Sequence, residues 1–132
     1  MKGYITNLEE STKTNTDFRR VLYTGKHSQL VLMSLKPGEE IGAEVHNHLD
    51  QFFRFEAGEG IVVIDNVKHK VGDGDAVIVP AGANHNVLNT SNDAELKLYT
   101  IYSPPEHQDK VIRHTTADAL ASPEEYDGKP TE

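Results

Sequence analysis

Short apolar runs recur along the middle of the chain, and each run is bounded by Gly, Pro, Asn or Asp. The stretch "ELKLYTIYS" alternates strictly between polar and apolar positions, and "VKHKV" alternates valine or histidine with lysine. A period of two is typical of a half-buried strand, and runs spaced by about 8–12 residues are typical of a β-sandwich or β-barrel. We therefore predict an all-β fold, with strands at 29–35, from 41, 51–57, 61–65, 67–71, 76–80, 86–89 and 95–103.

One segment has helical character, and it lies near the C-terminus, at residues 115–125, "TTADALASPEE". Thr115 or Thr116 would act as the N-cap, and Pro123 would stop the helix. The segment is short and lies outside the apolar middle of the chain. We expect it to form a short helix outside the β-structure.

The apolar residues are unevenly distributed, since only 36% of the chain is hydrophobic and both ends are polar. A chain of 132 residues is long enough for one domain with a core of its own. We divide it into an N-terminal arm at 1–20, a β-barrel domain at 21–104 and a C-terminal extension at 105–132 that carries the short helix.

Charge and composition exclude several classes of function. The net charge is −8, and the 13 basic residues are scattered, whereas nucleic-acid and anionic-membrane surfaces need clustered Lys and Arg. The chain has no cysteine, so any metal must be held by imidazole and oxygen ligands. No run resembles a signal peptide or a membrane helix, so we expect a cytoplasmic protein without nucleic-acid or membrane partners.

The stretch 42–53, "GAEVHNHLDQFF", combines two histidines one residue apart with acids and an amide on either side. On a regular strand, side chains two residues apart point to the same face, so several of these donors would share one face. Imidazole and carboxylate donors in this pattern indicate a metal site. The candidate ligands are Glu44, His46, His48, Asp50 and Gln51.

Two spaced motifs resemble those of the cupin superfamily. From Gly74, the pattern G-x5-P-x-G-x2-H-x3-N in "GDAVIVPAGANHNVLN" matches the second cupin motif without a gap. Residues 42–60 are similar to the first motif, in which His-x-His is followed by three or four residues, a Glu, six residues and a Gly. The resemblance implies a jelly-roll β-barrel with a divalent metal near its mouth, bound by two His, one Glu and a third His. With the flanking strands it covers about 30–103.

The first motif can be aligned in two registers. Counting six residues back from Gly58 places Gln51 where the family has its Glu, which makes the ligand set Glu44, His46, Gln51 and His85. The other register uses His46 and His48 as the pair and leaves only Leu49 and Asp50 before Gln51. A two-residue hairpin favours Asn-Gly-type residues, so loop length favours the first register.

The resemblance also implies chemistry. A divalent Zn, Ni, Mn or Fe ion with open coordination positions would act as a Lewis acid on a small oxygen-rich molecule, in an isomerisation or the opening of a sugar-type ring. Some cupins that linearise uronates also have Gln at the position of Gln51, a local similarity that does not assign the substrate. His48 and Asp50 are candidates for the general acid or base. The alternatives are a metal-dependent dioxygenase and a non-catalytic module that binds a small molecule or a metal.

Several further expectations concern assembly and individual side chains. Small cupins are commonly dimers, so we expect a homodimer, for which "YITNLEE" in the arm could add an edge strand. We expect Phe53 and Phe55 in the core. The histidines expected at the solvated surface are His27, His69, His107 and His114.

Overall fold

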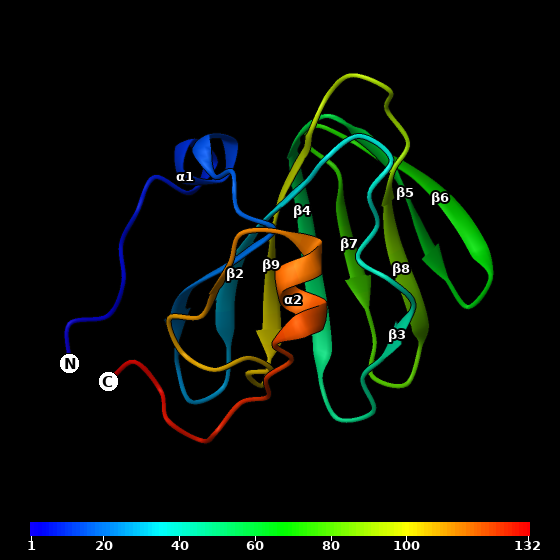
Figure 1. Ribbon diagram of the computed structural model, residues 1–132. Helices are drawn as coiled ribbons and strands as arrows, with labels where there is room; N and C mark the ends of the chain where they lie inside the picture. The colour runs from blue at the N-terminus through cyan, green and yellow to red at the C-terminus, as the bar shows by residue number, and fades with distance from the viewer.

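The computed structural model describes residues 1–132 and contains ten strands and two short helices (Figure 1). One sheet comprises β1 (Arg19–Thr24), β2 (Gln29–Leu35), β4 (Asp50–Ala57), β7 (Ala76–Val79), β9 (Leu96–Ser103) and β10 (Ile112–Arg113). The other comprises β3 (Glu44–Val45), β5 (Glu59–Ile64), β6 (Val67–Gly72) and β8 (Asn84–Asn89). The helices are α1 (Leu8–Thr14) and α2 (Thr116–Ala121), and neither is long and apolar enough to cross a membrane.

The two sheets form a jelly-roll, which confirms the predicted all-β fold. Their strand orders are β10-β1-β2-β9-β4-β7 and β3-β8-β5-β6, and all pairs are antiparallel. Hydrogen bonds join strands within each sheet but do not close the sheets into one continuous barrel. The strand expected from residue 41 is reduced to an isolated bridge at Glu40 and the two residues of β3.

A single hydrophobic core fills the space between the sheets. Sixteen buried residues form it, and Phe53 and Phe55 of β4 are 1% and 0% exposed, as expected. Gln51 lies two residues before Phe53, so its side chain points to the same inner face. The core thus carries one polar side chain from β4 toward the interior.

The connection between β3 and β4 is not a hairpin, which overturns the loop-length reason given for the ligand register. β3 pairs with β8, where Glu44 lies opposite His85, while β4 pairs with β7 and β9 in the other sheet. Residues 46–49 therefore cross from one sheet to the other. Two-residue hairpin rules do not apply to such a crossing.

The N-terminal arm contains a helix rather than the expected edge strand. Asn7 caps α1 by accepting a hydrogen bond from the Glu10 amide, and Lys13 pairs with Glu9 one turn away. The helix α1 contains too few apolar residues to show a helical period, so the sequence pattern did not predict this helix. The helix is attached through the Lys97 side chain, which donates to the Asn15 carbonyl just after α1.

The C-terminal extension returns to the sheets. Arg113 of β10 pairs with Arg19 of β1, and Figure 1 shows the two chain ends close together. Glu132 accepts hydrogen bonds from the amides of Lys2 and Gly3. The predicted helix is confirmed as α2, where the Thr115 side chain accepts from the Asp118 amide.

The glycine after β4 should be intolerant of substitution. Gly58 has φ +90°, and a Cβ there would lie 2.5 Å from the Glu95 carbonyl oxygen. We expect Gly58→Ala to lower the free energy of unfolding by about 2 kcal/mol, because left-handed strain and overpacking act together. Gly38→Ala is the matched control, because it has φ +77° but open space, and it should cost about 1 kcal/mol. Urea denaturation measures both, and equal losses would contradict the steric argument.

Candidate metal centre

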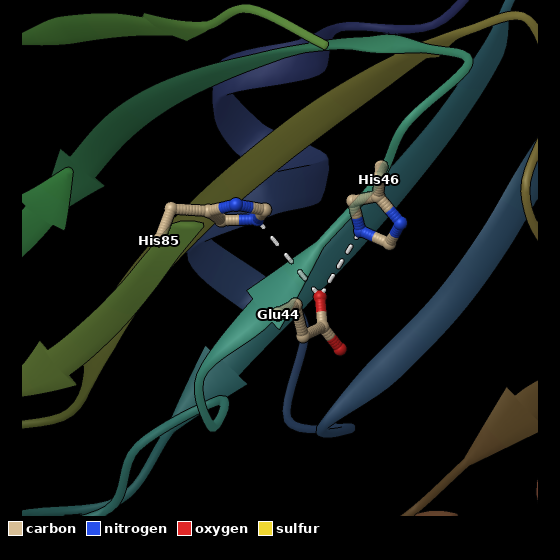
Figure 2. A group of neighbouring side chains, drawn as sticks. All are labelled: Glu44, His46 and His85. Atoms are coloured by element: carbon tan, nitrogen blue, oxygen red, sulfur yellow. Dashed lines mark hydrogen bonds and ion pairs between the residues drawn. The ribbon is translucent and has the colours of Figure 1, made fainter. Parts of the chain in front are cut away.

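Three side chains from the first and second motifs meet between the sheets. The ligand atoms of Glu44, His46 and His85 all lie within 4.8 Å of one another (Figure 2). One carboxylate oxygen, Glu44 Oε2, lies 3.2 Å from His46 Nε2 and 3.9 Å from His85 Nε2. A group of two imidazoles and one carboxylate could hold a metal ion.

Backbone pairing fixes this geometry. Glu44 and His85 are direct partners in the β3–β8 ladder, so their side chains leave the sheet on the same face. His46 follows β3, and its carbonyl accepts a hydrogen bond from the Gly82 amide at 2.8 Å. Gly82 has φ +90° and belongs to the Pro-x-Gly turn of the second motif. This turn therefore joins the segments that carry His46 and His85.

His85 is held in the tautomer that a metal ligand needs. Its Nδ1 lies 3.3 Å from the Ala83 carbonyl, which can only accept, so Nδ1 carries the proton. The buried Nε2 then presents a lone pair and has no hydrogen-bond partner. Burial lowers the pKa of His85, which keeps the ring neutral. Two lone pairs, on His85 and Glu44, thus face each other across 3.9 Å.

His46 and Glu44 interact more closely. The hydrogen bond to Glu44 raises the pKa of His46, against the opposing effect of burial. Burial by itself would raise the pKa of Glu44, but the interaction with His46 outweighs it and the pKa is lowered. The other nitrogen, His46 Nδ1, lies 3.7 Å from Glu106 Oε2. Carboxylates therefore flank His46 on both sides.

Gln51 points into the interior from β4 of the six-stranded sheet, whereas Glu44 and His85 belong to β3 and β8 of the other sheet. It is 2% exposed, and its Nε2 donates to Thr100 Oγ1 at 3.0 Å. Its Oε1 is buried and has no partner. The directly paired residue on β9 is Tyr102, whose ring lies 6.0 Å from the His46 ring. These ligand atoms therefore fit a cation. A buried oxygen or nitrogen atom that accepts no hydrogen bond is costly unless another group satisfies it.

The two predicted acid–base residues lie apart from this group. His48 is exposed and lines a separate hollow with Lys26 and Tyr126. Asp50 is also exposed, and its Oδ1 accepts a hydrogen bond from the Ala81 amide at 2.9 Å. Their catalytic role stays a prediction.

One histidine expected at the surface is buried, which corrects that expectation. His107 is 7% exposed because α2 and the segment after it fold over it. Its Nδ1 lies 2.6 Å from Glu124 Oε1, and its Nε2 lies 3.2 Å from the Tyr102 hydroxyl. Burial raises the pKa of Tyr102, so the hydroxyl stays protonated and can donate to His107. His27, His69 and His114 are exposed, as expected.

A cavity of about 210 Å³ opens beside Glu44 and His46. Sequence reasoning missed most of its wall, because that wall comes from the polar ends of the chain. Figure 1 shows α2 lying in front of β9 and β4, and side chains of this helix line the cavity. No motif signals these residues, and only the folding of both ends toward the sheets brings them here. The missed polar residues are Arg19, Glu106, Thr116 and Glu124.

Comparisons with known proteins identify a family and a relative to which this sequence is similar. The model of the family described as "Cupin domain" matches residues 31–102, which include all four predicted ligands. The uncharacterized protein YrkC of Bacillus subtilis (strain 168) is 47% identical over 127 residues, which cover 92% of this chain and 68% of that protein.

Solved structures show the same fold. The crystal structure of BH2720 from Bacillus halodurans has a TM-score of 0.88 and 46% identity, and the match covers 92% of this chain and 96% of that one. The structure of KdgF from Halomonas sp. has a TM-score of 0.61 and 19% identity over 65% of this chain and 76% of that one. At this lower identity the likeness concerns the fold alone.

Proposed function

Because the chain belongs to the cupin domain family, we propose that it is a metal-binding cupin whose site acts on a small oxygen-rich molecule. Glu44, His46 and His85 would hold a divalent Zn, Ni, Mn or Fe ion, with Gln51 Oε1 as a fourth ligand. The observation that carries the proposal is that the buried His85 Nε2 has no hydrogen-bond partner and lies 3.9 Å from Glu44 Oε2. A cation satisfies both.

The reaction that we propose is an isomerisation or ring-opening. When bound, the ion would supply Lewis-acid polarisation of a carbonyl or stabilisation of an enediolate. Of the chain's own residues, Glu106 could hold or accept a proton next to His46. Side chains of α2 exclude part of the solvent from the cavity. His48 and Asp50 remain proposed acid–base residues that would act through water.

Metal reconstitution tests this function. The purified protein is stripped with a chelator, reloaded separately with Zn, Ni, Mn or Fe, and assayed by elemental analysis and on a panel of small sugars and sugar acids. We expect about one ion per chain and turnover that depends on it. Oxygen uptake with Fe alone would indicate a dioxygenase instead. Ligand binding that persists without metal and without turnover would indicate a binding module.

Assembly and location are further proposals. We propose a homodimer in the cytoplasm, on the basis of the family resemblance. The N-terminal segment remains a candidate for contacts between copies, although it contains α1 and no strand. Light scattering decides the oligomeric state.

A further inference from the structure

Arg19 is a buried charge without a partner. It opens β1 opposite Met33, which is 1% exposed, so its side chain points into the interior. Arg19 is 8% exposed, and its buried Nε has no hydrogen-bond partner. Its guanidinium forms no ion pair and lies 5.4 Å from the centroid of the Phe18 ring. Arginine is seldom buried unless it is paired, because desolvating the charge is costly.

The guanidinium borders the same cavity as the candidate metal centre. Arg19 and Glu44 both line it, and so does Thr116 of α2, whose Oγ1 is buried and also lacks a partner. Two unpartnered polar groups, one from β1 and one from α2, thus meet at one cavity. Neither group has a hydrogen-bond partner within the chain, whereas buried polar groups are normally hydrogen-bonded.

The charge of Arg19 lowers the pKa of Glu44 and of Glu124, but the acids that line this cavity make their close contacts with other residues. Glu44 is bonded to His46, Glu124 is bonded to His107, and Glu106 lies 3.7 Å from His46. None of the three forms an ion pair with the guanidinium. The guanidinium therefore has no ion-pair partner within the chain.

We propose that this cavity binds a small monocarboxylate, with Arg19 pairing with the carboxylate and Thr116 hydrogen-bonding to it. Arginine recognises a carboxylate through two parallel N–H donors. Three carboxylates around the cavity disfavour a doubly charged phosphate. The volume of about 210 Å³ lies below the range of pockets for drug-sized ligands, so the ligand is small. This inference rests on the proposed function, whose substrate class it names as a small acid.

Calorimetric titration tests the proposal on the full chain, both metal-free and Zn-loaded. The probes are acetate, glycolate and lactate, each beside its neutral amide, and inorganic phosphate. We expect at least one carboxylate to bind while its amide does not. Arg19→Gln should weaken that binding by about tenfold or more, because charge-assisted hydrogen bonds are lost.

Two controls separate the possible outcomes. Arg20→Gln removes the same charge from the opposite face of β1, where Arg20 pairs with Asp17, and should leave carboxylate affinity unchanged. Arg19→Gln should keep the metal content of the natural chain. It should also keep or raise the Tm of the ligand-free protein, since a buried unpaired charge is removed.

Several results would overturn the carboxylate site. In the titrations, these are no binding of any carboxylate, equal binding of an acid and its amide, or tighter binding of phosphate than of every carboxylate. For the variant, they are an Arg19→Gln protein that binds carboxylate as tightly as the natural chain, or one whose Tm clearly falls. A natural chain that holds no metal would instead count against the proposed function. In that case the titrations of metal-free protein still decide the role of Arg19.

Discussion

Replacing His85 with alanine is expected to lower the affinity for the proposed metal ion by about 100-fold or more. The reason is geometric. The Ala83 carbonyl fixes the His85 ring so that Nε2 presents its lone pair 3.9 Å from the Glu44 carboxylate. Alanine removes this donor from the group of three. Elemental analysis after reconstitution measures the metal content, and circular dichroism checks that the β-fold is retained.

The two ligand registers give opposite results for Glu44→Ala and His48→Ala. His46→Ala and Glu44→Ala should also strip the metal, because both side chains belong to the group of three. His48→Ala should keep about one ion per chain, since His48 is exposed and lies outside that group. Loss of metal in His48→Ala together with retention in Glu44→Ala would establish the register that uses His46 and His48.

Replacing Glu124 with alanine is expected to lower the free energy of unfolding at neutral pH by about 3 kcal/mol. The side chains of Glu124 and His107 are 6% and 9% exposed, and their hydrogen bond joins the C-terminal extension to the sheets. Alanine leaves the His107 Nδ1 donor buried without an acceptor. Urea denaturation measures the loss. Glu125→Ala is the matched control, because Glu125 is exposed, and it should change stability by less than about 0.5 kcal/mol.

The same pair predicts a pH dependence of stability. Burial would raise the pKa of Glu124, but the hydrogen bond from His107 outweighs it, and the pKa lies below its ordinary value of 4.5. A carboxyl with a lowered folded-state pKa stabilises the fold above its unfolded pKa, and this stabilisation is lost as pH falls through the folded value. The difference in stability between the natural chain and Glu124→Ala should therefore shrink below about pH 4.5. A difference that stays constant down to pH 3 would contradict this role.

The sequence alone determined the all-β fold, because period-two alternation and turn residues act locally, while the jelly-roll form followed from the resemblance of the two motifs. The runs at 51–57 and 95–103 became β4 and β9, and Phe53 and Phe55 became core for the same reason. Motif spacing also singled out Glu44, His46 and His85, which the structure brings together. The hairpin argument for that register was wrong, since residues 46–49 cross between sheets, a fact of topology rather than of local pattern.

Only the tertiary structure decided what surrounds these ligands. The polar ends carry no period that predicts burial, yet α1 packs on the outside and α2 covers His107 and borders the cavity. Arg19 and Arg20 are adjacent and indistinguishable in the sequence, but the pleat of β1 turns one inward and the other outward. Burial changes the energetics of the two identical side chains: the half-exposed Arg20 pairs with Asp17, whereas the buried Arg19 has no ion-pair partner. Contacts between segments that are distant in the sequence determine that difference. These contacts cannot be read from the local sequence pattern.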